Sequence, residues 1–423
     1  MKKILSLLLV VVMLVGCCSA LASCGNDKDP SEIKAALIAL HGTSSTYDKN
    51  FIEAFETACQ NKGLKAENYT IITDIPEGTK CYEEAANFAD EGYDVIFADS
   101  FGHESHMLKA AKEFPNVQFC HATGTNAHTA GVANYQNAFA SIYEGRYLAG
   151  VAAGLKLVEL YGEDITAEEA KVGYVGAFPY AEVISGFTSW FLGVRSVVPN
   201  ATMVVRYTNS WYDEPAEKAT ADALIHQDEC KLISQHADSM GAPTACENAG
   251  IPNVAYNGTT NKENTFIIAS RINWVPYFEY MLDCVIKGED IKTDYTGTID
   301  TGSVVLTEVG TAAAAGTQAK LDAVKAQLKD GTLKVFDCSK FTVKNAKADT
   351  SEFSKAGSIT MDENGKLTGY IADVDDAGDY VPETEVIKTE GGVTYFAESE
   401  LRSAPYFDII IDGITIGASV EVN

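Results

Sequence analysis

The stretch from Lys231 to Pro243, KLISQHADSMGAP, joins an apolar strand-like segment to a polar end. Ligands of open α/β sheets bind just beyond the carboxyl ends of the strands. The Asp238 carboxylate can accept hydrogen bonds there from ligand N–H or O–H groups. We therefore expect Asp238 to be a polar anchor in a cleft, with a helix N-cap as its alternative role. We expect His236 to be a buried imidazole that supports the loop carrying Asp238.

Other strand ends of the chain carry aromatic rings and amides, which suit a flat heterocycle with hydrogen-bonding edges. Tyr47 and Trp211 can sandwich such a ring, and Asn257 can offer it both a donor and an acceptor. Trp274 has hinge packing as its alternative role. The predicted ligand-binding residues are Tyr47, Asp48, Asn50, Phe101, Phe178, Trp211, Asp238, Asn257 and Trp274.

Signatures of enzymes and metal sites are missing from the sequence. There is no GxGxxG motif, no phosphate-binding P-loop, no GxSxG elbow and no HExxH pair. His103, His106 and His121 could approach one another, but no carboxylate or thiolate spacing supports a metal site. We expect no catalytic residue, no metal and no cofactor.

Strand-like and helix-like segments alternate along the chain, which predicts an α/β fold with two doubly wound lobes. We expect lobe 1 at 33–165 and lobe 2 at 171–270. A long helix is expected at 137–157, and Asn134, Tyr135 and Asn137 have turn chemistry as their alternative role. The remaining C-terminal residues, 343–423, are expected to pack on the lobes as an extension.

The N-terminus has the pattern of a bacterial lipoprotein. Two lysines precede an apolar run, so residues 1–24 are expected to be a signal peptide and 25–32 a linker. Cys24 is the preferred lipidation site and Cys17 its alternative. Cleavage at Cys24 would leave seven other cysteines, which show neither a disulfide framework nor zinc spacing. A net charge of −27 argues against nucleic-acid binding.

A set of motifs resembles the basic membrane protein (BMP) family, whose members are substrate-binding lipoproteins of ABC importers. The motifs span about residues 33–310 and are FADSFGHES, FPNVQFCHATG, YEGRYLAG, VGYVGAFPYAEVISG, NSWYDEP, QHADS and NWVPY. The chain looks closest to the purine-binding branch. Tyr47 matches an aromatic position where relatives often carry Trp, Trp211 matches an N-x-W motif, and Asp238 matches a Q-H-x-D motif.

This resemblance implies a type I periplasmic-binding-protein fold with a three-crossing hinge. The crossings would lie near Thr166–Lys171, Arg271–Trp274 and Thr296–Val304. Lobe 1 would then gain about 273–296, and lobe 2 about 300–342.

The function that the resemblance implies is capture of a purine base or nucleoside by lobe closure, followed by delivery to a membrane permease. The first loop, SSTYDKN, has Asp48 as its one acidic residue, which favours a base. We expect a monomer, lipid-anchored at the extracytoplasmic face of the cell membrane. Alternatives are a ligand-sensing subunit of a signalling system and an envelope enzyme acting on nucleosides.

Overall fold

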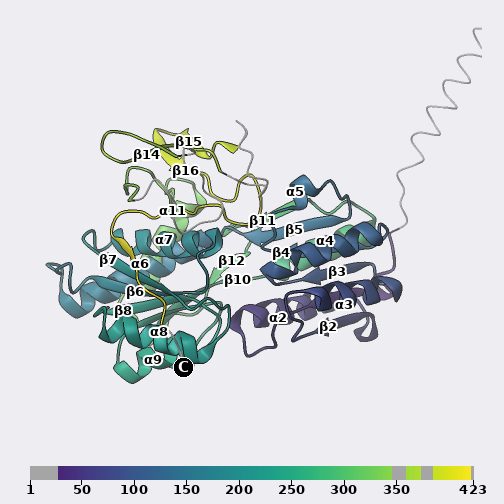
Figure 1. Cartoon of the computed structure of the whole chain (residues 1–423), viewed down its shortest axis with the longest axis horizontal. Coiled ribbons are helices and arrows are strands. Elements are labelled where there is room, and N and C mark those ends of the chain that lie inside the picture. The colour runs from purple at the N-terminus through teal and green to yellow at the C-terminus, as the bar shows by residue number, and fades with distance from the viewer. Residues whose placement is uncertain (1–26, 345–358, 373–383, 421–423) are drawn as a thin grey trace, which may run out of the picture.

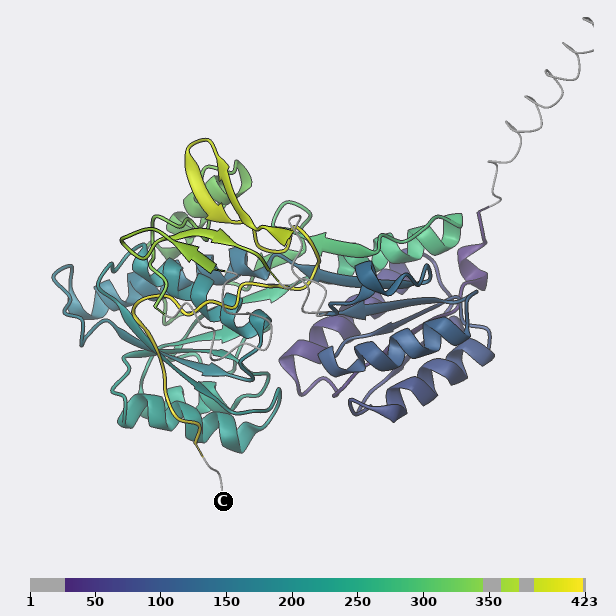
Figure 2. The same cartoon turned by 45° about the horizontal axis from the view of Figure 1, so that its top comes forward.

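The computed structural model describes residues 27–344, 359–372 and 384–420. Two α/β lobes lie side by side, and the C-terminal residues form a further layer against lobe 2 and the junction (Figure 1, Figure 2). The expected signal peptide, Cys17 and Cys24 lie outside the described residues. In the ranges described, none of the helices combines the length and apolar character that a membrane span requires.

Lobe 1 is built on a six-stranded parallel sheet in the order β11-β5-β4-β3-β1-β2. The strands are β1 (Ala35–Ile38), β2 (Tyr69–Ile72), β3 (Val95–Ala98), β4 (Gln118–Ala122), β5 (Tyr135–Ala140) and β11 (Asp294–Gly297). Its helices are η1 (Pro30–Glu32), α2 (Thr46–Asn61), η2 (Ala66–Asn68), α3 (Thr79–Asp90), η3 (Phe101–His103), α4 (Glu104–Glu113), α5 (Ala127–Ala130) and α10 (Val275–Lys287). β1 and β3 are wholly buried and apolar, as expected for parallel strands covered on both faces.

Lobe 2 repeats this strand order in a seven-stranded sheet, β12-β10-β9-β8-β6-β7-β17, in which β12 alone is antiparallel to its neighbour. The strands are β6 (Lys171–Gly176), β7 (Thr202–Tyr207), β8 (Leu232–His236), β9 (Asn253–Tyr256), β10 (Phe266–Ile272), β12 (Val304–Leu306) and β17 (Ile414–Ile416). Its helices are α6 (Ile142–Tyr161), α7 (Ala181–Arg195), α8 (Glu214–His226), α9 (Gly241–Ala249) and α11 (Thr317–Lys329).

The segment before α6 differs from the sequence expectation. A helix was expected from residue 137, with turn chemistry as the alternative for Asn134, Tyr135 and Asn137, but Tyr135–Ala140 forms β5, between β4 and β11, and the helix begins at Ile142. Its polar residues concealed the strand, because their side-chain N–H groups find acceptors inside the lobe. Asn137 Nδ2, for example, donates to Glu104 Oε1 at 3.2 Å.

Helix α6 packs on α7 and on β10, so it belongs to lobe 2 and not to lobe 1. The chain therefore crosses first at Ser141, and not near Thr166–Lys171. It crosses again between β10 and α10, at 273–274, and a third time between β11 and β12, at 298–303.

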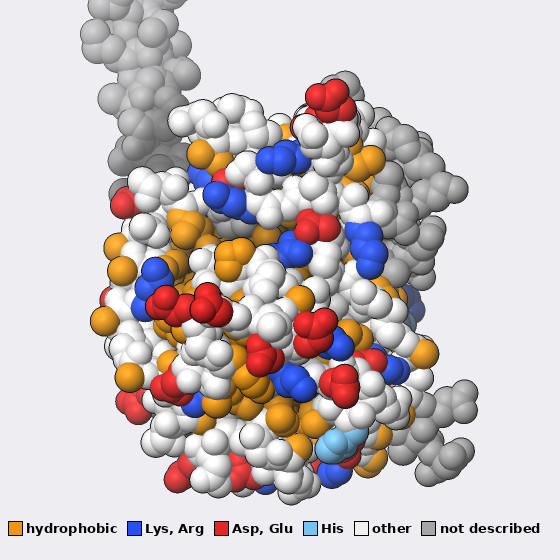
Figure 3. Space-filling view, turned by 90° about the vertical axis from the view of Figure 1, so that its left-hand side faces the viewer, with side chains coloured by type: hydrophobic (Ala, Val, Ile, Leu, Met, Phe, Trp, Pro, Cys, Tyr) orange, Lys and Arg blue, Asp and Glu red, His pale blue; other side chains and the backbone are white. Residues whose placement is uncertain are grey.

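The C-terminal extension, defined here as the described residues after 336, contains two hairpins. They are β13 (Ile359–Met361) with β14 (Leu367–Tyr370), and β15 (Ile387–Glu390) with β16 (Val393–Phe396). Its last strand, β17, pairs with β7 at the edge of lobe 2. Figure 3 shows this end of the molecule, where acidic and basic side chains are interspersed with hydrophobic ones.

The cysteines within the described residues are seven free, buried thiols, in agreement with the absence of a disulfide pattern. Burial raises the pKa of Cys59 to about 12, and the Glu56 carboxylate adds to the shift. A buried thiol of this kind behaves as a small apolar side chain.

Glycines set the distance between α6 and α7. A Cβ on Gly150 would lie 1.9 Å from the Trp190 carbonyl oxygen, and one on Gly193 would lie 2.1 Å from that of Tyr147. The two helix backbones are therefore in direct contact. This contact attaches α6 to lobe 2 immediately after the first crossing.

Gly150→Ala is expected to destabilise the protein, because overpacking of about 1–3 kcal/mol or more outweighs a helix-propensity gain of about 1 kcal/mol. Urea denaturation followed by circular dichroism measures the change. Gly42→Ala is the control, since no atom lies within 4 Å of its added Cβ. A Gly150→Ala protein as stable as wild type would contradict this account of the helix contact.

Candidate functional site

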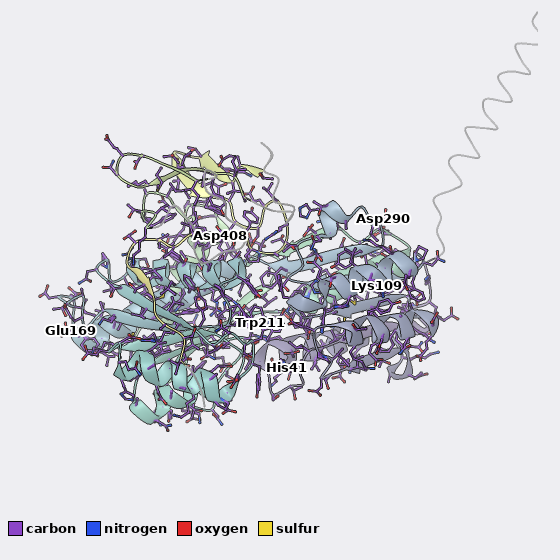
Figure 4. The ribbon with its side chains drawn as sticks, viewed as in Figure 1. His41, Lys109, Glu169, Trp211, Asp290 and Asp408 are labelled. Carbon is purple, nitrogen blue, oxygen red and sulfur yellow. The ribbon has the colours of Figure 1, made fainter. Side chains whose placement is uncertain are left out.

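A cavity of about 360 Å³ lies between the lobes, at the carboxyl ends of β1 and β3 in lobe 1 and of β6 and β8 in lobe 2. These strand pairs flank the point in each sheet where the strand order reverses, the usual ligand position in such sheets. Trp211 and His41 mark the junction in Figure 4. The cavity is lined by Leu40, Tyr47, Asp48, Ser100, Phe101, Thr123, Glu182, Trp211, His236, Asp238 and Tyr256.

Asp238 lies in this cavity, and its main chain is held on both sides. Its N–H donates to the Trp211 carbonyl at 3.0 Å, and its carbonyl accepts from the Thr46 N–H at 3.1 Å. The next residue, Ser239, donates its N–H to the buried carboxylate of Glu217 at 3.2 Å. Asp238 is therefore fixed by the Trp211 loop and α8 of lobe 2 and by the first turn of α2 in lobe 1.

The Asp238 carboxyl has no hydrogen-bond partner among the described residues, although the residue is 5% exposed. Helix α9 begins after Met240 without a side-chain cap, so Asp238 does not serve as its N-cap. Burial raises the pKa of Asp238 well above its ordinary value. The carboxylates of Asp48, Glu217 and Glu182 add to the shift, and Arg146 opposes it. A ligand donor would satisfy this carboxyl.

Glu182 is a second carboxyl in the cavity, and sequence reasoning did not select it. It lies in the first turn of α7, and its Oε1 is 3.4 Å from His236 Nε2. Burial raises the pKa of Glu182 to about 7, against the opposing charge of Arg146. The motif GAFPYAEV, at the end of β6, was the available signal for this residue.

His236 lines the cavity and is 2% exposed. Its Nδ1 lies 3.4 Å from the Tyr174 hydroxyl, and its ring is 4.7 Å from that of Tyr256. Burial lowers the pKa of His236 well below its usual value, and the charge of Arg146 adds to this. His236 is thus a neutral imidazole that joins Glu182 to the core of lobe 2.

Arg146 of α6 is a fully buried cation behind the cavity. Its guanidinium carbon lies 3.4 Å from the centre of the Tyr256 ring, and Nη1 donates to the Gln235 carbonyl at 2.9 Å. Among the described residues, its Nε and Nη2 have no hydrogen-bond partner. This cation offsets part of the negative charge of Glu182 and Asp238, since a cation nearby favours the ionised form of a carboxyl.

Aromatic side chains form two walls of the cavity. Tyr47 is fixed from lobe 1, because its hydroxyl donates to the Asp99 carbonyl at 2.8 Å. Trp211 comes from lobe 2 and packs edge-on against Phe178, at 5.1 Å between ring centroids. Phe178 stacks on Tyr180, and Tyr180 stacks on Phe101 of lobe 1. Phe178 is therefore a support for Trp211, one layer behind the cavity wall.

Asp48 borders the cavity, but its carboxylate already accepts hydrogen bonds from within lobe 1. It accepts from the Ser45 hydroxyl at 2.5 Å and from the His41 N–H at 2.7 Å, while Ser45 caps α2. Burial alone would raise the pKa of Asp48, but hydrogen bonds from His41 and Ser45 outweigh it, so the pKa is lowered. Its main structural effect is to shape the loop that carries Tyr47.

Besides Phe178, three of the predicted residues do not line the cavity: Asn50, Asn257 and Trp274. Trp274 is 2% exposed and stacks on Phe51 at 4.3 Å in the core of lobe 1, which is the hinge-packing alternative. Asn50 donates from Nδ2 to the Asn257 carbonyl at 2.8 Å, a contact between the lobes. Both residues follow strand ends or begin helices at the cleft, so their positions in the sequence could not show whether they contact a ligand or the other lobe.

Two of the three histidines considered for a metal site, His103 and His121, are hydrogen-bonded to backbone carbonyls. His103 Nε2 lies 2.9 Å from the Ile75 carbonyl, and His121 Nε2 lies 2.6 Å from that of Ser100. In the part of the chain that the structure describes, no three His, Cys, Asp or Glu side chains group as metal ligands would.

Two lobes with the same order of their first six strands, three crossings and a cavity at both switch points define the type I periplasmic-binding-protein fold. Solved structures with TM-scores above 0.5 share this fold. A solute-binding protein of an Aeropyrum pernix ABC transporter system has a TM-score of 0.59 and 15% identity, over 72% of this chain and 93% of its own. One from Conexibacter woesei has a TM-score of 0.55 and 20% identity, over 71% and 98%.

The profile of the Bmp family, described as ABC transporter substrate-binding protein PnrA-like, matches residues 36–336. The chain belongs to this family, so it is a substrate-binding protein of an ABC transporter. Such proteins act outside the cytoplasm, where they bind a small molecule and a membrane permease. The resemblance found in the sequence is thereby confirmed.

Two relatives are each 31% identical to the chain. One is a purine-binding protein of Brucella abortus, matched over 74% of this chain and 84% of its own length. The other is a Haloferax volcanii protein whose name describes it as a provisional glucose-binding protein of an ABC transporter. That match covers 64% of this chain and 66% of the Haloferax protein, somewhat less than two thirds of it.

The raised pKa of Glu182 makes a prediction for the unliganded protein. The folded state holds a proton that the unfolded state releases above its own pKa of 4.5, so stability should fall as the pH rises from about 4.5 to about 7. Each pKa unit corresponds to about 1.4 kcal/mol, so Glu182 contributes at most about 3 kcal/mol to this fall. Thermal unfolding at pH 5 and pH 8 measures the difference.

Glu182→Gln should reduce that pH dependence, because the amide does not titrate. Exposed Glu163→Gln is the matched control and should unfold with the wild-type pH profile. If Glu182→Gln keeps the full wild-type difference between pH 5 and pH 8, Glu182 is not the titrating group.

Proposed function

We propose that this substrate-binding protein captures a purine base or nucleoside in the cavity between its lobes. The observation that carries the proposal is the buried, unpartnered Asp238 carboxyl beside the rings of Tyr47 and Trp211. Purines offer N–H donors at the edge of a flat ring, so one ligand can stack on both rings and satisfy the carboxyl. The Brucella relative, whose name describes purine binding, supports the same class.

The mechanism is capture without chemistry. A ligand that contacts both lobes binds the closed state more tightly than the open state, so it shifts the population towards closure. The closed protein is then presented to the permease. We also propose that the protein is a monomer held at the membrane by a lipid on Cys24, or on Cys17.

A sugar is the second candidate ligand, because the name of the Haloferax relative describes glucose binding. Carboxylates and aromatic faces also suit sugar hydroxyls and their apolar faces. The purine proposal is favoured here because Tyr47 and Trp211 provide a ring on each lobe.

A thermal-shift screen tests the proposal with adenine, guanine, hypoxanthine, their nucleosides, riboflavin and glucose. A ligand present at 100 times its Kd should stabilise the protein by about 2.7 kcal/mol. We expect a purine or its nucleoside to raise the Tm. Stabilisation by glucose alone would refute the purine proposal.

Asp238→Asn should weaken purine binding by about 2 kcal/mol or more, because an amide with one fixed donor replaces the carboxyl in a buried site. Isothermal titration measures the affinity, and the variant should stay folded because Asp238 caps no helix. Asp222→Asn, on the surface of α8, is the control. Unchanged affinity in Asp238→Asn would show that Asp238 does not contact the ligand.

A further inference from the structure

The side of the cavity next to α2 is closed by hydrogen bonds between the lobes. Thr46 of α2 donates its N–H and its hydroxyl to the Asp238 carbonyl, at 3.1 and 3.3 Å. Asn50 donates to the Asn257 carbonyl at 2.8 Å, and Arg271 donates to Asn50 Oδ1 at 3.2 Å. Beyond this barrier lies a separate cavity that shares no lining residue with the first.

The opposite side of the cavity continues into a second space, which is partly open to solvent. Phe101, Thr123 and Glu182 line both spaces, so the two are adjoining. The remaining lining residues are Thr125 of lobe 1, Tyr180 and Ala181 of lobe 2, and Arg402, Ala404 and Pro405. The last three belong to the C-terminal extension, which lies beyond residue 336, the end of the family match.

Hydrogen bonds hold the stretch from Arg402 to Pro405 in a defined turn. The buried Arg402 side chain donates from Nε to the Ala404 carbonyl at 3.3 Å and from Nη2 to the Pro405 carbonyl at 3.1 Å. Ser403 donates both its N–H and its hydroxyl to Asp294 Oδ1 on β11, each at 2.8 Å. The turn is therefore fixed to lobe 1 while it faces the second space.

We propose that the turn Arg402–Pro405 is a wall of the ligand site, and that the second space is a subsite for a polyhydroxylated substituent on the base, such as ribose. This inference rests on the proposed function. It assigns a specificity-determining role to a segment outside the part of the chain shared with the family.

The chemistry of the lining supports a sugar-like group. Glu182 offers carboxylate oxygens that accept from hydroxyls, and Thr123 and Thr125 add hydroxyl oxygens. The stacked rings of Phe101 and Tyr180, 5.3 Å apart, offer an apolar face.

Ala404→Leu tests the subsite, because it fills the second space from the extension without touching Asp238, Tyr47 or Trp211. Isothermal titration should compare adenine with adenosine, and guanine with guanosine, on the wild-type and variant full-length proteins. Nucleoside affinity should fall at least about tenfold, and base affinity less than about threefold. Binding of the base also reports that the variant is folded, and Ala404→Val provides a smaller step should Ala404→Leu fail to fold.

Ala397→Leu is the matched control, since Ala397 is equally buried in the extension but borders a different cavity near the hinge. It should leave the ratio of nucleoside to base affinity unchanged. Equal loss of base and nucleoside binding in Ala404→Leu, or no loss, overturns the subsite. A wild-type protein that binds bases but no nucleoside also overturns it. A wild-type protein that binds neither refutes the proposed function itself.

Discussion

The main chain of Asp238 is the point on which the site depends. Its N–H and carbonyl join the loop after β8 to the loop of Trp211 and to the first turn of α2 in the other lobe. The same residue that presents a carboxyl to the cavity therefore also brings the two lobes together. Because these bonds use backbone atoms, the side chain remains available for a ligand.

The electrostatics of the cavity follow from burial. Two carboxyls, Asp238 and Glu182, lie in a space with little water, and a buried charge without a partner is costly. Arg146 offsets part of this cost from behind Tyr256, at the expense of guanidinium hydrogen bonds that it does not make within the described residues. A ligand with matching donors removes the free-energy cost of the unpartnered carboxyls, whereas a ligand without such donors leaves this cost in place. Selectivity therefore arises from unsatisfied groups as much as from new contacts.

The sequence predicted the α/β class and the strand ends that form the cavity, because apolar runs followed by polar loops are local features. It did not predict β5, whose Asn137 donates from Nδ2 to Glu104 of another element. It also selected Asn50 and Trp274, while Glu182 and Tyr256 line the cavity in their place. Whether a residue at a strand end lines the cavity depends on which side of its loop faces the other lobe. This orientation is set by packing between segments that are distant in the sequence. Arg146 is part of the motif YEGRYLAG, but the sequence did not predict a role for it. Its charge affects the cavity from behind Tyr256 and Gln235, and this position is set by the fold.

Closure of the lobes is finely balanced in this arrangement. The hydrogen bonds from Thr46, Asn50 and Arg271 between the lobes each contribute about 0.5–1.5 kcal/mol net, so together they amount to only a few kcal/mol. Closing also buries the carboxyls of Asp238 and Glu182, and this cost opposes the hydrogen bonds. A difference of a few kcal/mol keeps both states accessible, and a ligand that satisfies Asp238 is then sufficient to decide between them. In the proposed mechanism, the acidic cavity therefore makes closure depend on the ligand, because the hydrogen bonds between the lobes would by themselves favour an empty closed protein.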